Sequence, residues 1–347
     1  MNVLALIEQP GNVCCRYRID AYAPELAKRG HRLQTISLRE GGRLRFLLYH
    51  AVADADLVIL QRKLLPSWQL SLVRRLAKSL VYDFDDAVFQ RDSFQAKGPQ
   101  SLRRQRRFLA TIRAADTVIA GNAYLGRHAS RIRGAGRVRI VPTTVRTDSY
   151  RPATHVRTGA GVRLVWIGSS STLQGLELAA RHLQAAGERT AGLELHLVCD
   201  RMADFPGVAV VPRRWSAATE AEDVAAADVG VSYLPDDAWS RGKCGLKVLQ
   251  YMAAGLPVVA NPVGMNRRMV VDGQTGLLAD SPGEWARAIA RLAADPALRR
   301  RMGAAGRRAV EQRYSVERWG PQWADILESA VRRPLTEKVR VRAIRAA

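Results

Sequence analysis

"GKCGLKVLQYMAAGLPVVANPVG", residues 242–264, predicts a helix that leads directly into a buried strand. Leu249, Met252 and Ala253 lie at helical spacing on an apolar face, and Gly255 ends the helix ahead of a Leu-Pro pair. The short apolar run that follows is typical of a strand covered on both faces of its sheet. A helix followed by such a strand indicates an α/β domain with a parallel sheet.

The same alternation extends along nearly the whole chain. In the first half we expect strands at 2–7, 31–37, 56–61, 80–85, 117–121 and 138–141, with helices near 17–29, 43–53, 66–78, 100–114 and 123–132. In the second half we expect strands near 162–168, 194–199, 208–212, 229–234, 257–261 and 276–279, then three helical stretches that begin at Pro282, Pro296 and Ser315. This order predicts right-handed βαβ crossovers, and hence the α/β class with two Rossmann-like, doubly wound domains that face each other across a cleft.

The stretch "VPTTVRTDSYRPATHVRTGAG", residues 141–161, interrupts the alternation with prolines, threonines and glycines, and we interpret it as the connection between the domains. The predicted domains are therefore residues 1–150 and 151–314. Residues 315–332 form a last helix, and residues 333–347 form a basic tail.

Composition limits the class of protein. The chain has 347 residues, of which 47% are hydrophobic, enough to fill the cores of two domains. Its start, "NVLALIEQ", resembles no signal peptide, and no run of about eighteen apolar residues occurs, so the sequence indicates a cytoplasmic protein. Its four cysteines have neither CxxC spacing nor suitably placed histidines, which predicts reduced thiols and no metal site.

The formal net charge of +22 predicts an anionic partner. Nucleic acid is disfavoured, because the arginines are spread over the chain and aromatic residues make up only 6% of it. The densest cluster, "SLRRQRRFLATIRAAD", instead suggests a helix on an anionic membrane surface; the alternative is a solvated basic helix. That cluster combines Arg103, Arg106, Arg107 and Arg113 with Leu102, Phe108, Leu109 and Ile112.

The loop "PDDAWSRGKCG" precedes the helix of the opening stretch and has the composition of a phosphate site. Backbone amides at a helix start attract anions, and Gly242 and Gly245 let a ligand approach the backbone closely. Lys243 and Lys247 can neutralise a diphosphate. The alternative is that the lysines are merely solvated.

A second loop, "WIGSSSTLQGLE", follows the first strand of the second domain. Gly168 allows a turn, Ser169, Ser170 and Ser171 offer hydroxyls and amides, and Thr172 can cap the next helix. The loop matches neither the GxGxxG pattern nor a Walker A sequence, so a plain helix cap is the alternative.

Two loops of the first domain also follow predicted strands. "EQPGNVCCRYRIDAYAPELAKRG" has a glycine turn at Gly11 and Asn12, with Arg16, Tyr17 and Arg18 near the start of a helix. "VYDFDDAVF" ends a buried strand in Asp83, Asp85 and Asp86. Carboxylates at this edge are candidates for binding hydroxyls or accepting a proton. A DxD metal site is less favoured. For Asp83, purely local hydrogen bonding is an equal alternative.

Taken together, these motifs resemble the retaining glycosyltransferases of family 4, which have the two-domain GT-B architecture. The most specific part is "GLKVLQYMAAGLPVVANPVGMNRRMVVDGQTGLLA", and "ADLVILQR", "VYDFDDAVF", "AADTVIAGNAYL" and "RIVPTTV" support it. The resemblance implies a nucleotide-diphosphate sugar held mostly by the second domain, an acceptor held mostly by the first, and a final helix that crosses back onto the first domain. It implies no metal and no cofactor besides the sugar donor.

The chain departs from the family where two glutamates usually flank the phosphate loop, since Gly242 and Gln250 stand there. Gln250 can still form hydrogen bonds with ribose hydroxyls. Gly242 has no carboxylate, so sugar recognition would pass to backbone amides or to Asp236 and Asp237. Ser169 and Gln174 replace the usual arginine and lysine. The expected donor site thus comprises Gly168, Ser169, Ser170, Ser171, Thr172, Arg241, Lys243, Cys244, Gly245, Lys247 and Gln250, with the lysines and Arg241 as a relocated clamp.

In the front-face mechanism that the resemblance implies, the acceptor hydroxyl attacks on the leaving-group side, and Asp86 or Asp85 orients a hydroxyl or stabilises positive charge. Gly11, Asn12, Arg16, Tyr17 and Arg18 are the expected acceptor-binding residues. We expect a glycan or lipid-linked acceptor of the cell envelope, and a protein that binds the inner face of a membrane. The alternatives are a catalytically silent nucleotide-sugar-binding protein, a nucleotide-sugar epimerase and, last, a nucleic-acid-binding module.

Overall fold

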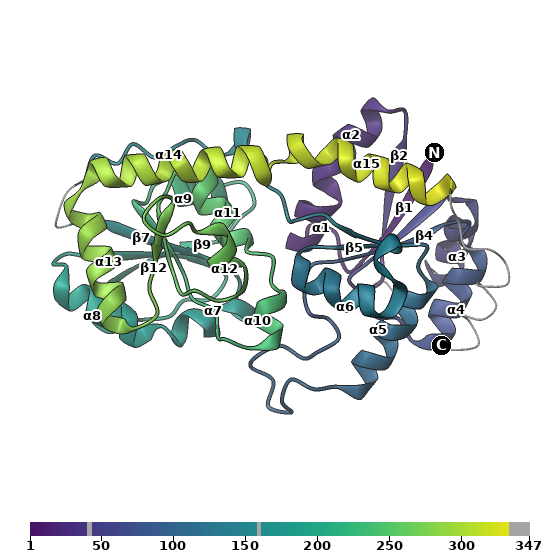
Figure 1. Cartoon of the computed structure of the whole chain (residues 1–347), viewed down its shortest axis with the longest axis horizontal. Helices are drawn as coiled ribbons and strands as arrows, with labels where there is room; N and C mark the ends of the chain where they lie inside the picture. Colours follow the sequence, from purple (N-terminus) through teal and green to yellow (C-terminus); the bar gives the residue numbers. More distant parts are fainter. Residues whose placement is uncertain (40–43, 158–160, 333–347) are drawn as a thin grey trace. The chain divides into compact units, whose positions relative to one another are not determined.

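The structure is a computed structural model that describes residues 1–39, 44–157 and 161–332 (Figure 1). Its contacts divide the chain into two compact units. Of the described residues, those within Met1–Thr144, Arg241–Cys244 and 316–332 form the first unit, and those within Val145–Ser240 and Gly245–Ser315 form the second. Each unit contains one six-stranded sheet whose strand pairs are all parallel.

The sheet of the first unit has the strand order β2-β1-β3-β4-β5-β6. Its strands are β1 (Asn2–Ile7), β2 (Arg32–Ser37), β3 (Leu57–Gln61), β4 (Leu80–Phe84), β5 (Thr117–Ala120) and β6 (Val138–Ile140). Its helices are α1 (Val13–Arg18), α2 (Ala23–Lys28), α3 (Leu44–Asp54), α4 (Ser67–Leu76), α5 (Leu102–Ala114), α6 (Ala123–Arg133) and α15 (Val316–Arg332), with 3₁₀ turns η1 (Asp20–Tyr22) and η2 (Ala135–Arg137). All five residues of β3 and of β4 are buried, which fits their mainly apolar composition; Gln61 and Asp83 are the polar exceptions.

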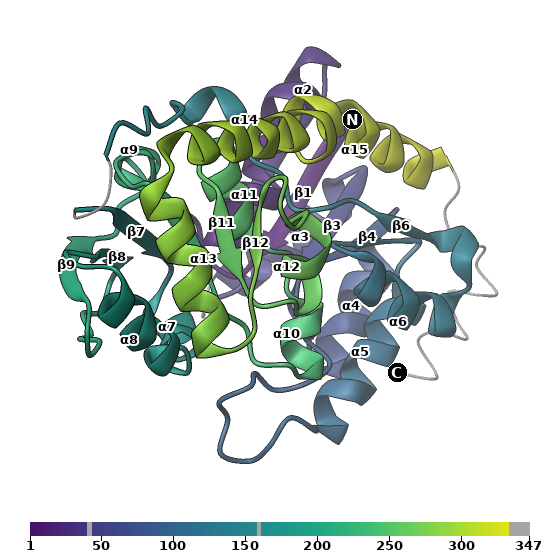
Figure 2. The ribbon, with the colours of Figure 1, turned by 60° about the vertical axis from the view of Figure 1, so that its left-hand side comes forward.

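The second unit repeats this design with the order β12-β11-β10-β7-β8-β9 (Figure 2). Its strands are β7 (Arg163–Ile167), β8 (Glu194–Cys199), β9 (Ala209–Arg214), β10 (Val229–Ser232), β11 (Val258–Ala260) and β12 (Gly276–Leu278). Its other elements are η3 (Thr147–Ser149), α7 (Ser170–Glu177), α8 (Ala180–Arg189), α9 (Glu220–Ala225), α10 (Ala238–Gly242), α11 (Leu246–Ala253), α12 (Gly264–Met269), α13 (Pro282–Ala294) and α14 (Pro296–Arg313). The last residues of α10, Arg241 and Gly242, fall by contact in the first unit.

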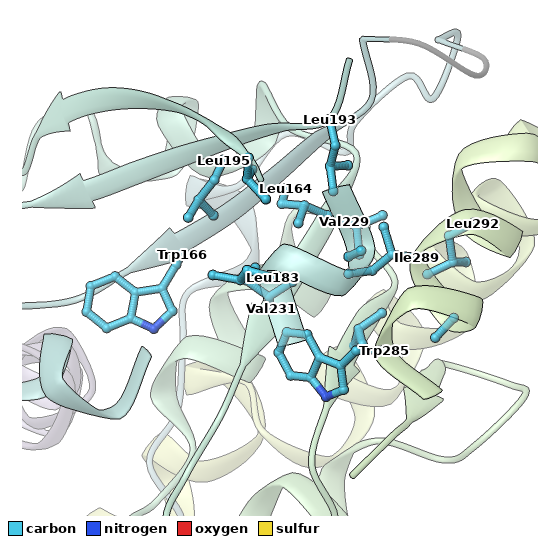
Figure 3. Packing of buried hydrophobic residues seen from close by; sticks show 14 of the residues in the cluster. Leu164, Trp166, Leu183, Leu193, Leu195, Val229, Val231, Trp285, Ile289 and Leu292 are labelled. Carbon is cyan, nitrogen blue, oxygen red and sulfur yellow. The ribbon is translucent and has the colours of Figure 1, made fainter. Parts of the chain in front are cut away.

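Both cores lie between sheet and helices. Figure 3 shows Leu164, Trp166 and Val231 of the second sheet meeting Leu183 of α8 and Trp285 of α13, all among the buried residues of one cluster. In the first unit, α15 contributes Trp323, whose ring stacks on Tyr22 with centroids 4.9 Å apart. The two parallel sheets confirm the α/β class expected from the sequence.

Three boundaries differ from the sequence expectation. The helix expected over 17–29 is broken into α1 and α2, because η1 intervenes and Pro24 starts a new helix. The strand expected over 229–234 ends at Ser232, where the amide of Leu234 turns to the side chain of Asn261. The first unit ends at Thr144 rather than at 150, because Val145 already pairs with Ser315 of the second unit.

The expected basic tail, residues 333–347, lies outside the described residues. Within the described part of the chain, no helix is both long enough and apolar enough to cross a bilayer.

Candidate functional site

The loop between β7 and α7 packs closely against Lys247 in the second unit, and we call the group of Gly168, Thr172 and Lys247 the lysine corner. A methyl group added at Gly168 would come within 2.7 Å of the Thr172 hydroxyl oxygen and 2.8 Å of the Lys247 ammonium nitrogen. Glycine is therefore required where β7 ends, so that the backbone can pass close to the lysine. The hydroxyl of Ser169 lies 2.8 Å from that of Ser171, and Ser169 and Thr172 form a reciprocal cap at the start of α7.

Lys247 reaches this corner from the first turn of α11. Its Nζ lies 3.2 Å from the Thr172 hydroxyl and 4.7 Å from the centre of the Trp166 ring. The aromatic face stabilises the cation beside the loop that joins β7 to α7. Gly245, at φ 71°, adopts the left-handed conformation that starts α11 and aims this turn. The structure thus brings together Gly168, Thr172 and Lys247, three of the expected donor residues.

Asp200, which the sequence analysis did not single out, occupies the start of α7. Its carboxylate accepts hydrogen bonds from the Ser170 amide at 2.6 Å and from the Ser170 hydroxyl at 2.9 Å. Burial alone would raise the pKa of Asp200, but these hydrogen bonds lower it below its usual value. The backbone amide of Ser170, which was expected to bind a phosphate, therefore already donates to the Asp200 carboxylate. The only hint in the sequence is an aspartate directly after the apolar run of β8.

Gln250 lies in the interior of the second unit. Its side chain is 3% exposed, and its amide donates to the hydroxyl of Tyr150 at 3.1 Å. Tyr150 is itself buried. This arrangement uses the glutamine side chain for packing between α11 and the segment that precedes β7.

The segment from Arg241 to Cys244 belongs by its contacts to the first unit, whereas Gly245 and Lys247 belong to the second. The side-chain amide of Asn122 donates to the carbonyls of Gly242 at 2.9 Å and Lys243 at 3.2 Å. A Cβ on Gly242 would lie 2.8 Å from that of Ala87, so no larger residue fits. The expected clamp of two lysines is therefore divided between the units.

Cys244 is a buried contact of this segment, because its thiol donates to the Asp85 carbonyl at 3.2 Å. Burial, reinforced by the Asp85 charge, raises the pKa of Cys244. Burial likewise raises the pKa of Cys14 to about 11, so both thiols are protonated at neutral pH.

Asp83 and Arg18 form a buried ion pair in the first unit. Nε and Nη2 of Arg18 each lie 2.7 Å from a carboxylate oxygen of Asp83, and Nη1 donates to the Val141 carbonyl at 3.1 Å. The side chains are 2% and 0% exposed. Arg18 was expected to bind the acceptor; the structure places its guanidinium in the interior, where it joins α1 to β4.

Arg62, at the end of β3, faces the other two aspartates. Its guanidinium pairs with Asp86, lies 3.9 Å from Asp85 and donates to the Cys14 sulfur at 3.0 Å. Arg62 has φ 60°, a left-handed conformation that is uncommon for a residue with a side chain and recurs at functional sites. The Asp86 and Asp85 charges outweigh burial and raise the pKa of Arg62. Sequence reasoning missed this residue, although it closes the motif "ADLVILQR".

Asp85 and Asp86 therefore have different surroundings. Burial raises the pKa of Asp85, with the Arg62 charge acting in the opposite direction, and its Oδ1 has no hydrogen-bond partner among the described residues. Asp86 is 14% exposed and paired directly with the guanidinium. Asp86 is thus the carboxylate held in a defined orientation.

The remaining expected acceptor residues lie around the start of α1. Gly11 is exposed at φ 72°, and the Asn12 side-chain oxygen accepts from the Cys14 thiol at 3.4 Å. The Arg16 guanidinium carbon lies 5.4 Å from the centre of the Tyr17 ring, within range of a cation–π contact. Among the described residues, no group of three or more metal-ligating side chains is placed to hold a metal ion.

Comparison with known proteins finds a family that resembles the second unit. Residues 156–295 match the model of the family described as glycosyl transferases group 1. This part of the chain is therefore similar to that family. The matched region contains Gly168, Thr172 and Lys247. A D-inositol 3-phosphate glycosyltransferase from Xylanimonas cellulosilytica is 27% identical over 64% of this chain and 59% of its own length. The chain thus spans less than two thirds of the curated relatives that it matches.

Two solved structures resemble the fold of 95% of the chain. A sucrose-phosphate synthase from Thermosynechococcus elongatus is 20% identical with a TM-score of 0.74, over 95% of this chain and 98% of that chain. The Anabaena protein Alr3699/HepE, in complex with UDP and glucose, is 17% identical with a TM-score of 0.70, over 95% of this chain and 100% of that chain. These likenesses confirm the expected GT-B fold.

Proposed function

We propose that the protein is a retaining glycosyltransferase that moves a sugar from a nucleotide-diphosphate donor to an acceptor hydroxyl. The observation that carries the proposal is the lysine corner of a glycosyl transferases group 1 region, where Lys247 stands beside Gly168 and Thr172. UDP is the first nucleotide to test, since structures of HepE contain UDP and UDP-glucose. Membership of family 4 fits the quoted motifs.

In this proposal, Lys247 stabilises the leaving diphosphate. Departure of the donor sugar leaves negative charge on the phosphate oxygens, and a fixed ammonium nearby lowers the barrier because it needs little reorganisation. The Thr172 hydroxyl, 3.2 Å from the ammonium, holds that side chain in place. No metal and no further cofactor is proposed, because the lysine supplies the positive charge that a metal would otherwise contribute.

Asp86 is the candidate catalytic carboxylate of the first unit. Its fixed pairing with Arg62 suits it to orient a substrate hydroxyl rather than to attack the sugar. In a front-face transfer the acceptor proton passes to the departing phosphate, so no nucleophilic carboxylate is required. Arg16 and Tyr17, on the neighbouring α1, remain candidates for acceptor binding.

Replacing Lys247 by alanine is expected to weaken UDP binding about 10- to 100-fold, because a charge-assisted contact contributes roughly 1.5–3 kcal/mol. Isothermal titration calorimetry of the full chain with UDP measures the change. Lys28→Ala, which removes an exposed lysine of α2, is the matched control and should bind like wild type. Equal affinities for Lys247→Ala and wild type would contradict the donor site. UDP binding without turnover of any UDP-sugar would favour the silent binding protein.

We also propose that the acceptor is a glycan or lipid-linked molecule of the cell envelope, and that the protein acts at the inner face of an anionic membrane. The surface that supports this is at the starts of α4 and α5, where Trp68 is 59% exposed and Leu102 is 72% exposed. The Arg107 guanidinium donates to the Leu64 carbonyl at 3.4 Å, which ties α5 to the segment before α4. Figures 1 and 2 both show these two helices side by side.

The same surface is basic. Arg103, Arg104 and Arg106 are exposed on α5, which contains no acidic residue. Exposed apolar side chains surrounded by arginines are the pattern of proteins that dock on anionic lipid. We do not propose a nucleic-acid-binding function for this surface, because binding to a nucleic acid would give the exposed Trp68 and Leu102 no role.

Arg103→Gln/Arg106→Gln is expected to weaken binding to vesicles containing phosphatidylserine about 30-fold, since each arginine near such a surface contributes about 1 kcal/mol. Trp68→Ser/Leu102→Ser should weaken it as well. Co-sedimentation at several vesicle concentrations measures the effect. Arg181→Gln/Arg189→Gln, on α8 of the second unit, is the charge-matched control. Equal losses in both arginine pairs would mean that net charge alone attracts the protein.

A further inference from the structure

A cavity of about 280 Å³ lies in the second unit, apart from the lysine corner. Pro152 and His155 form one wall, α14 forms the other, and Gly255, just after α11, also lines it. None of Gly168, Thr172 and Lys247 contributes to it. The cavity is therefore lined by different residues from those of the lysine corner.

The walls are held in place by close packing. A Cβ on Gly303 would overlap the Gly255 carbonyl, so only glycine lets α14 approach α11 at this point. One residue further, Ala304 is exposed and small, which leaves space above the helix. Arg307 then fastens α14, because Nη1 donates to the carbonyls of Tyr150 and Ala253, each at 2.6 Å.

The cavity is lined by positive charge that the described residues do not neutralise. Arg300 makes one long hydrogen bond, 3.3 Å to the His155 carbonyl, and Arg308 has no hydrogen bond or ion pair within the described residues. Both are exposed. The acidic group at the cavity, Glu311, already pairs with Nε of Arg307 at 2.9 Å. Arg300 and Arg308, two turns apart on α14, thus line the cavity, and the described residues give neither of them a carboxylate partner.

His155 marks the cavity as incomplete. Its side chain is 3% exposed, and its Nε2 lies 2.7 Å from the Gly255 carbonyl, which can only accept, so Nε2 carries the proton. Burial lowers the pKa of His155, so the ring is neutral and Nδ1 is a bare acceptor. Nδ1 has no partner among the described residues, and the backbone is in the left-handed region at φ 53°. Because Nδ1 can only accept, the partner it lacks is a donor, which a singly protonated phosphate group supplies.

We propose that this cavity binds a small phosphate-bearing anion, at a site separate from that of the sugar donor. Guanidinium groups match the geometry of phosphate oxygens, and Arg300 and Arg308 supply two of them on one rigid helix. The cavity is large enough for a small metabolite. The wall opposite α14 is the segment that leads into β7. A bound anion therefore ties that segment to α14 and stabilises the second unit.

The probe is inorganic pyrophosphate, titrated into the full-length protein at 0.15 M salt and followed by calorimetry. The protein carries Lys247→Ala, so that binding at the donor site does not contribute to the signal. Adding Arg300→Gln/Arg308→Gln should lower the affinity about tenfold or more, as expected for the loss of two charge-assisted contacts. The charge-matched control adds Arg291→Gln/Arg301→Gln, which are exposed on α13 and α14 away from the cavity, and should change it less than about twofold.

Equal losses in the two pairs, or no pyrophosphate binding by Lys247→Ala, would overturn the inference. Failure of the proposed function gives a different result, namely no UDP binding by the wild type with pyrophosphate binding retained. The two hypotheses are therefore tested independently.

Discussion

Arg18→Met is expected to lower the free energy of unfolding of the first unit by about 3–5 kcal/mol, because it leaves the buried Asp83 carboxylate without its counter-ion. Asp83 is fully buried, and both of its oxygens lie 2.7 Å from the guanidinium. Hydrogen exchange of the β4 backbone, followed by mass spectrometry, reports the opening free energy of this region directly.

Two controls make this result specific. Arg29→Met removes an arginine that is 25% exposed and pairs with Asp325 and Glu328, and it should cost no more than about 1 kcal/mol. Arg18→Met/Asp83→Leu removes both charges and should recover most of the lost stability. If Arg18→Met were as stable as wild type, the guanidinium would not be structural, and acceptor binding would become its leading role.

Asp86→Asn is expected to reduce turnover about 100-fold or more, with little change in UDP affinity, because the amide keeps the shape of the side chain but loses the charge that orients a hydroxyl. The measurement is the turnover rate with the UDP-sugar that the protein transfers, together with calorimetry for UDP. Such a pattern places the loss in the chemical step rather than in donor binding.

Asp85→Asn is the matched control on the same loop. Burial raises the pKa of Asp85. Its carboxylate lies 3.9 Å from the Arg62 guanidinium and so does not contact it directly. Its replacement should affect turnover much less than that of Asp86. A larger loss with Asp85→Asn would reassign the role, and unchanged turnover in both variants would remove the carboxylates from the mechanism.

The fold was largely predictable from the sequence, because its signals are local. Most strands of the parallel sheets are short apolar runs, and most helices carry a periodic apolar face, so these elements need no distant partner to be recognised. β2 and β9 also contain polar and charged residues. The break between α1 and α2 was missed because the apolar pattern continues across Pro24. The positions of Gly168, on the loop after β7, and Lys247, at the start of α11, followed from the same reasoning.

The partners of the polar side chains could not be read in this way. Arg18 and Asp83 are 65 residues apart in the chain. Arg62 follows β3 and pairs with Asp86, which follows the neighbouring strand β4. The sequence assigned Arg18 to the acceptor and Gln250 to ribose, whereas the structure places Arg18 in a buried ion pair and Gln250 against Tyr150. The role of Asp200, which accepts a hydrogen bond from the Ser170 amide at the start of α7, was not predicted.

What the sequence by itself determined is the alternation of elements, the two parallel sheets and the loops at which polar residues gather. Only the tertiary structure decided which of those residues point inward and pair, because an ion pair or hydrogen bond depends on atoms brought within about 3 Å by the whole fold. Periodicity is a property of neighbouring residues, whereas the orientation of Arg62 or the empty acceptor of His155 depends on packing between segments far apart in the chain.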